Sequence, residues 1–118
     1  MYATAQRLVV EAVSRTGIVV LRIQGRLDAD AAPKLMTRCT QVRDQGQSLV
    51  LNLSGVTFLG LSGIGALLVL SELFQEQGGA MRLAALSDAA STVVELLELD
   101  ARLIIDATEE DAISAMGG

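Results

Sequence analysis

Residues 48–79 read SLVLNLSGVTFLGLSGIGALLVLSELFQEQGG, and this segment gives the clearest indication of the fold class. It opens with Ser48 to Leu53, a short and nearly all-apolar run that is typical of a central strand covered on both faces. Ser54-Gly55 then reads as a turn. A second apolar run, from Ser62 to Gln77, predicts a helix that ends at Gly78-Gly79. A strand, a turn and a helix in this order indicate an α/β fold.

The same stretch is also long enough to cross a bilayer, because no charged residue occurs between Asp44 and Glu72. Polar residues and glycines interrupt the span, which favours a strand, a loop and a buried helix instead. These residues are Asn52, Ser54, Gly55, Thr57, Gly60, Ser62, Gly63 and Gly65. The first residues of the chain also lack the long apolar segment of a secretory signal. We therefore expect no direct membrane insertion and a cytoplasmic protein.

Elements on the N-terminal side extend the α/β pattern. Leu8 to Val13 and Ile18 to Leu27 are rich in β-branched residues and flank a polar connection, which predicts an antiparallel hairpin. Apolar residues at spacings of three and four then predict a helix from Asp30 to Gln45. Asp30 is its candidate N-cap and Gly46 its candidate stop.

The C-terminal side continues the alternation of strands and helices. We expect strands at Met81 to Ala85 and Leu103 to Asp106, a helix capped by Ser87 that runs to about Leu99, and a closing helix from Glu109 to Met116. The whole pattern predicts an α/β fold with a mixed, mostly parallel sheet of about five strands, an N-terminal antiparallel hairpin and about four helices. At 118 residues the chain fits one domain, residues 1–118.

The composition excludes several classes of function. Histidine is absent, which removes the usual general base, the usual zinc ligand and the usual partner of a nucleophilic serine. The net charge of −5 and the 3% aromatic content argue against binding DNA or RNA. The single cysteine, Cys39, lies at helical spacing with Leu35 and Val42 and reads as a core residue. We expect no catalytic residue, metal or cofactor, and hence no enzyme.

The turn before the second helix fails the familiar catalytic motifs. A nucleophile elbow needs Gly-x-Ser-x-Gly, whereas Gly63 follows Ser62 directly. No lysine or arginine occurs from Asp44 to Met81, so a phosphate-binding P-loop is also missing. A hydroxyl remains at the expected start of a helix, where backbone amides favour negative charge. Ser62 either caps this helix or carries a phosphate, and the residues alone favour the cap.

Several blocks of the sequence, taken in order, resemble the STAS domain, a module of sulfate transporters and bacterial anti-sigma factor antagonists. They span about Val19 to Leu103. The blocks are Gly25-Arg26-Leu27-Asp28, similar to the family's Gly-x-Leu-Asp; residues 49–58, similar to its central strand and loop; Ser62-Gly63-Ile64-Gly65, similar to its Ser-Gly-Leu-Gly helix start; and Ser87 to Leu99, similar to its next helix.

For the antagonist branch, the resemblance implies a partner switch. An anti-sigma factor that is also a serine protein kinase binds the unphosphorylated domain and inactivates it by phosphorylation. Ser62 matches the phosphorylated serine, and Asp28 matches an acidic residue near that site, although it equally fits a turn or cap. The partner-binding residues implied are Asp28, Gly60, Leu61, Ser62, Gly63 and Ile64. We expect a monomer or weak dimer.

Two residues depart from the family pattern, which commonly reads Asp-Ser-Ser-Gly where this chain has Gly60-Leu61-Ser62-Gly63. The carboxylate and the neighbouring serine are both absent. The alternative function is therefore a STAS domain that binds constitutively, as a scaffold or as an accessory subunit of a transporter or lipid-transport complex.

Two groups of side chains are open to both a structural and a functional interpretation. Leu61 either extends an apolar docking patch or belongs to the core, and we favour the core. Four cations could form a basic rim, but ordinary surface solvation is the default explanation. They are Arg22, Arg26, Lys34 and Arg38.

Overall fold

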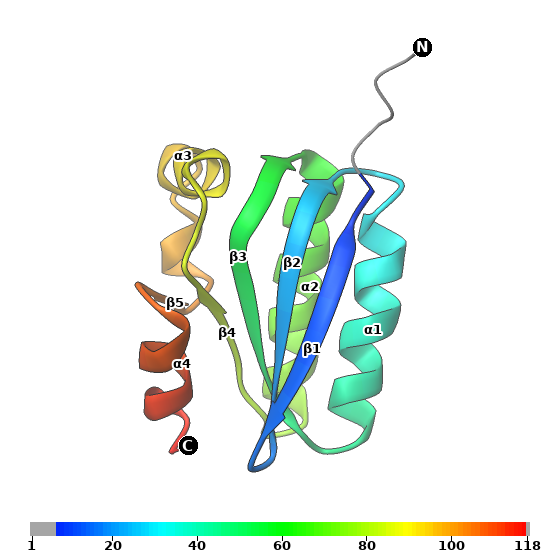
Figure 1. Cartoon of the computed structure of the whole chain (residues 1–118), viewed down its shortest axis with the longest axis vertical. Coiled ribbons are helices and arrows are strands. Elements are labelled where there is room, and N and C mark those ends of the chain that lie inside the picture. The colour runs from blue at the N-terminus through cyan, green and yellow to red at the C-terminus, as the bar shows by residue number, and fades with distance from the viewer. Residues whose placement is uncertain (1–6, 118) are drawn as a thin grey trace.

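The computed structural model describes residues 7–117 and shows an α/β fold with one five-stranded sheet (Figure 1). The sheet has the order β1-β2-β3-β4-β5; β1 and β2 are antiparallel, and the other neighbours are parallel. The predicted fold class is confirmed. The elements are β1 (Val9–Arg15), β2 (Ile18–Leu27), α1 (Ala32–Asp44), β3 (Ser48–Leu59), α2 (Leu61–Glu76), β4 (Met81–Ala84), α3 (Asp88–Leu96), a 3₁₀ turn η1 (Leu99–Ala101), β5 (Ile105–Asp106) and α4 (Glu109–Ala115).

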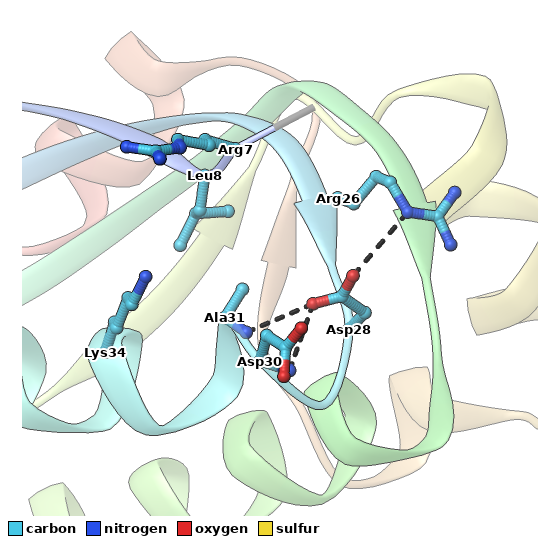
Figure 2. Close-up of a pocket in the computed structure, with 7 residues that line it drawn as sticks. All are labelled: Arg7, Leu8, Arg26, Asp28, Asp30, Ala31 and Lys34. Atoms are coloured by element: carbon cyan, nitrogen blue, oxygen red, sulfur yellow. Dashed lines mark hydrogen bonds and ion pairs between the residues drawn. The ribbon is translucent and has the colours of Figure 1, made fainter. Parts of the chain in front are cut away.

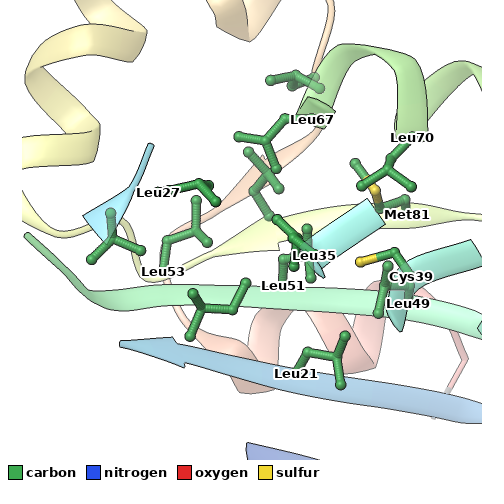
Figure 3. Packing of buried hydrophobic residues seen from close by; sticks show 14 of the residues in the cluster. Leu21, Leu27, Leu35, Cys39, Leu49, Leu51, Leu53, Leu67, Leu70 and Met81 are labelled. Carbon is green, nitrogen blue, oxygen red and sulfur yellow. The ribbon is translucent and has the colours of Figure 1, made fainter. Parts of the chain in front are cut away.

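The central strand β3 is buried on both faces because alternate residues point into two separate clusters. Leu49, Leu51 and Leu53 join the large cluster that packs under α1, α2 and α3, as Figure 3 shows in part. Val50 points to the other face, into a small cluster closed by Ala112 of α4. Shortening one of the fully buried leucines to alanine costs about 2–5 kcal/mol in such a core.

Cys39 lies in the large cluster, fully buried on the inner face of α1. Burial raises the pKa of its thiol to about 12, so the thiolate does not form near neutral pH. The prediction of a core cysteine is confirmed. Within residues 7–117, no helix is both long enough and apolar enough to span a membrane.

The predicted turn at Ser54-Gly55 is wrong, because β3 runs without interruption through both residues to Leu59. The turn signal reflects an irregularity in the strand, where the register between β2 and β3 shifts. Asn52 Oδ1 accepts the Ser54 amide at 2.9 Å, as in a turn. Gly55 is required here, since a Cβ atom would lie 2.6 Å from the Gln24 side chain.

Two of the predicted helix caps are also wrong. The N-cap of α1 is Ala31, and it is Asp28 rather than Asp30 that accepts the amides of Asp30 and Ala31, at 3.2 and 3.1 Å. The N-cap of α2 is Gly60, which places Ser62 second in the helix instead of at its cap. In both cases the sequence offers several candidate caps within a few residues, and only the packed loop selects one.

Other boundaries agree with the sequence. Ser87 caps α3 by accepting the Ala90 amide at 3.1 Å, as predicted. Gly46 and Gly78 follow α1 and α2 with φ of +73°, where glycine is favoured. The helix after Ser87 ends at Leu96 and not at Leu99, because Glu98 turns left-handed and starts η1.

Candidate functional site

The candidate site lies where β2 and β3 end side by side, at the carboxyl ends of these strands, drawn at the top of Figure 1. Because these strands are parallel, the loop from β2 to α1 and the turn from β3 to α2 meet there. The Gly60 amide donates a hydrogen bond to the Leu27 carbonyl oxygen at 3.1 Å. This bond joins the two connections directly.

Gly63 presses the first turn of α2 against the end of β2. A Cβ atom at this position would lie 2.7 Å from both the carbonyl oxygen and the Cγ of Leu27, and 3.0 Å from Leu59 Cδ1. Only glycine permits so close an approach without movement of the backbone. The side chain of Ile64 is buried as well, so Gly63 and Ile64 hold the turn from beneath.

Leu61 and Ser62 lie on the outer side of the same turn. Leu61 is 82% exposed, so the prediction of a core leucine is wrong. The helix starts at Leu61, and its first residue points away from the sheet while Gly63 and Ile64 point inward. Ser62 is exposed, and its hydroxyl makes no hydrogen bond within residues 7–117.

An apolar groove of about 340 Å³ runs beside Ser62, between α1 and α2. Small residues make much of its lining, and among the described residues Ser62 is its only polar side chain. It is lined by Ala29, Ala32, Pro33, Met36, Ser62, Gly65, Ala66 and Val69. We call Leu61, Ser62 and this groove the Ser62 surface.

Asp28 holds the neighbouring loop in shape (Figure 2). Its Oδ1 accepts the amides of Asp30 and Ala31, and its Oδ2 lies 3.6 Å from Arg26 Nε. The Ala31 amide, with smaller contributions from Asp30 and Arg26, lowers the pKa of Asp28 below its usual value. The structure thus shows the turn role of Asp28.

Gly60 is the N-cap of α2, which has no side-chain cap and no acidic residue in its first turn. The ring of Phe58 occupies the adjoining space, 2.8 Å from where a Cβ atom of residue 60 would lie. Arg26 lies over this ring, 4.2 Å from its centroid. The residue at the cap position therefore offers no carboxylate to the backbone amides at the start of α2.

Sequence reasoning missed the Arg26–Phe58 contact and the groove. Arg26 and Phe58 are paired across β2 and β3, but the register shifts between them could not be counted from the sequence. The groove depends on how far apart α1 and α2 pack. Among the described residues, no three His, Cys, Asp or Glu side chains gather where they could hold a metal ion.

The STAS domain family model matches residues 9–112, which contain the whole sheet and the candidate site. The chain belongs to the STAS domain family. The resemblance read from the sequence is thereby confirmed. Ser62 and Asp28 lie inside the matched region, on the two connections that meet at the end of the sheet.

Known relatives of this STAS domain include anti-sigma factor antagonists. The anti-sigma-B factor antagonist of Bacillus subtilis (strain 168) is 24% identical over 95 residues, or 80% of this chain and 87% of the relative. An anti-sigma factor antagonist from Mycobacterium paratuberculosis has a TM-score of 0.85 at 26% identity, and the match covers 95% of this chain and 96% of that one.

The anti-sigma factor antagonist SpoIIAA has been solved in two forms, and both resemble this STAS domain. The unphosphorylated form has a TM-score of 0.75 at 27% identity, covering 95% of this chain and 97% of that one. The phosphorylated form, from Bacillus, has a TM-score of 0.69 at 27% identity, covering 93% and 99%. The STAS fold expected from the sequence is confirmed.

Proposed function

We propose that this STAS domain is an anti-sigma factor antagonist that binds its partner through the Ser62 surface and is switched off by phosphorylation of Ser62. The partner is an anti-sigma factor that is also a serine protein kinase, and the chain acts as a non-enzymatic binding module. Its antagonist relatives, one of them solved in a phosphorylated form, support this role.

One observation carries the proposal. Ser62 presents an exposed hydroxyl, free of hydrogen bonds within residues 7–117, beside an 82%-exposed leucine and at the edge of an apolar groove. An exposed apolar patch of this kind is typical of a protein-binding site. A kinase that docks on this patch contacts Ser62 directly.

The geometry supports a simple mode of release. Phosphorylation adds about −1.5 to −2 charges near neutral pH. A docked apolar partner would have to remove water from that charge, which is strongly unfavourable. In the free protein the phosphate stays hydrated, and the uncapped start of α2 favours a negative charge. Both effects favour the dissociated state.

Asp28 supports the surface in this proposal by shaping the loop that carries Ala29, one wall of the groove. Gly60, Gly63 and Ile64 contribute in the same indirect way. Gly63 and Ile64 are buried, so their part is to place Ser62 and Leu61, the residues that a partner would touch.

The test combines the full chain with each purified anti-sigma factor kinase from its source organism, with and without ATP. Intact-mass analysis should show one added phosphate on the wild type and none on Ser62→Ala. Ser114→Ala, which removes an exposed serine from α4, is the matched control and should still be phosphorylated. An unmodified wild type at saturating kinase, or a phosphate retained in Ser62→Ala, contradicts the proposal.

A second candidate function rests on the exposed Leu61 and the missing acid at Gly60. A constitutive scaffold, or an accessory subunit of a transporter or lipid-transport complex, would use Leu61 as a permanent apolar contact. In that case Leu61→Asp abolishes binding, whereas ATP and Ser62→Ala leave it unchanged. The switch instead requires that ATP releases the wild type from the anti-sigma factor kinase and leaves Ser62→Ala bound.

A further inference from the structure

The cationic side chains of this chain fall into two groups. All nine lysines and arginines lie within residues 7–117, and six of them form ion pairs there. Arg22, for example, binds Glu109 and Glu11, and Arg26 pairs with Asp28. Arg7, Lys34 and Arg38 form no ion pair or side-chain hydrogen bond within the described residues. All three are exposed.

Two of the unpaired cations, Arg7 and Lys34, lie together beside the start of β1. Arg7, Leu8 and Lys34 line one cavity of about 300 Å³, and Figure 2 shows the Lys34 amine directed toward Leu8. Arg38 follows Lys34 by one helical turn on the same face of α1. The chain at Arg7 is closely packed on β2, since a Cβ atom at Gly25 would overlap the Arg7 carbonyl oxygen.

The two acidic residues in this cavity do not neutralise the cations. Asp28 is occupied by backbone amides and by Arg26. Asp30 belongs to the same loop and is exposed, and no ion pair joins it to Lys34 or Arg7 within the described part of the chain. A local excess of positive charge in a chain of net charge −5 indicates an acidic partner.

The neighbouring strand offers a second feature. β1 lies at the edge of the sheet and, in the described residues, pairs with β2 alone, in unbroken register over all seven residues. Alternate residues of such a strand direct their N–H and C=O groups away from the sheet. A long edge strand without proline or bulge can accept another strand.

We infer that the edge of β1, together with Arg7, Lys34 and Arg38, binds an extended acidic segment of a partner protein as an added strand. Backbone hydrogen bonds to β1 supply the pairing, and acidic side chains of the segment face the three cations. We call this the β1 edge site. It is separate from the Ser62 surface and does not rest on the proposed function.

The experiment uses a fluorescent peptide that alternates valine with glutamate, and a matched peptide with lysine in place of glutamate. The acidic peptide should bind the full chain at least about tenfold more tightly than the basic one. Lys34→Glu with Arg38→Glu should remove this preference. Arg43→Glu with Arg102→Glu makes the same change in net charge at cations that are already paired, and should leave binding unchanged.

A second measurement locates the peptide. Neighbouring residues of an edge strand direct their N–H groups to opposite sides, so Glu11→Pro and Ala12→Pro remove one inward and one outward donor. The variant that loses the outward donor should stay folded and lose peptide binding. In the wild type, hydrogen exchange of alternate β1 amides should slow when the acidic peptide binds.

Several results overturn the inference. These are equal affinity for the two peptides, equal loss of binding in the two double variants, protection outside β1, or no binding of the acidic peptide. The inference would also fail if duplex DNA or anionic vesicles bound through Lys34 and Arg38 without protecting β1, because the cations would then serve a different partner.

Discussion

The first turns of α2 and α4 are built in opposite ways. α4 begins with a capping threonine, Thr108, followed by three acidic residues, and Glu109 accepts hydrogen bonds from Arg22 at 2.8 and 2.9 Å and from Asn52 at 3.0 Å. α2 begins with Gly60, has no side-chain cap and no acid, and exposes Leu61.

The difference follows from how each helix is held. α4 has only seven residues and buries two of them, Ala112 and Ile113, so polar contacts at its start add needed stability. α2 has sixteen residues and is anchored by a buried face that includes Leu67, Leu70 and Phe74. Its outer first turn is therefore free of stabilising polar contacts and remains available to a partner.

The largest expected effect concerns the inner side of the α2 start. Gly63→Ala places a methyl group against the Leu27 backbone and should lower the free energy of unfolding by about 1–3 kcal/mol, measured by urea denaturation. Gly65→Ala is the control, because among the described residues no atom outside its own stretch of helix lies within 4 Å of its Cβ position. It should raise stability by about 0.5–1 kcal/mol. Equal effects of the two changes would disprove the close packing at Gly63.

The next effect concerns the α4 start and depends on pH. Arg22 and Asn52 lower the pKa of Glu109 from 4.5 to about 2. A carboxyl whose pKa is lowered by folding stabilises the protein at pH values above its pKa in the unfolded chain. This contribution is lost as pH falls from about 5 through 2. Glu109→Gln should cost about 1 kcal/mol of stability at neutral pH. The cost is this small because water reaches the Arg22 side chain and screens the ion pair.

The control for this prediction is Glu110→Gln. Glu110 is 69% exposed and lies 3.4 Å from Arg15, so its replacement should change stability little. The stability of Glu109→Gln should also fall less steeply than that of the wild type between about pH 5 and 2. If the free energies of unfolding of the wild type and Glu109→Gln changed in parallel with pH, Arg22 and Asn52 would not lower the pKa of Glu109.

An effect of similar size is expected at the cap of α4. Thr108 accepts the Asp111 amide at 3.0 Å, so Thr108→Ala should cost about 1 kcal/mol by the same denaturation measurement. Thr92→Ala is a useful comparison, because that hydroxyl bonds a carbonyl inside α3 and caps nothing. A larger loss at Thr92 than at Thr108 would contradict the importance of this cap.

The smallest effect tests the uncapped start of α2. Ser62→Asp adds a negative charge at the second helical residue and should raise stability by about 0.3–1 kcal/mol at low salt. Ser62→Asn, of similar size but uncharged, is the control. High salt should reduce the difference between the two variants. A destabilising Ser62→Asp would argue that the start of α2 does not favour a phosphate.

Much of this fold could be predicted from local patterns. The apolar run before Ser54 predicted the central strand, the alternation of elements predicted the mixed sheet, and the glycines after α1 and α2 marked where those helices end. These signals are local, because periodicity and backbone conformation depend on residues close in the chain. The motif around Ser62 was visible for the same reason.

Local patterns along the chain were therefore enough to place most strands and helices and to single out Ser62 at the turn. The atoms that surround this serine follow instead from the packing of distant segments. Gly60 rather than Ser62 precedes the helix, Leu61 faces solvent, and Asp28 shapes the loop next door. The start of α2 is set by how closely this helix approaches β2 at Gly63, a contact between residues far apart in the chain that no local pattern reveals.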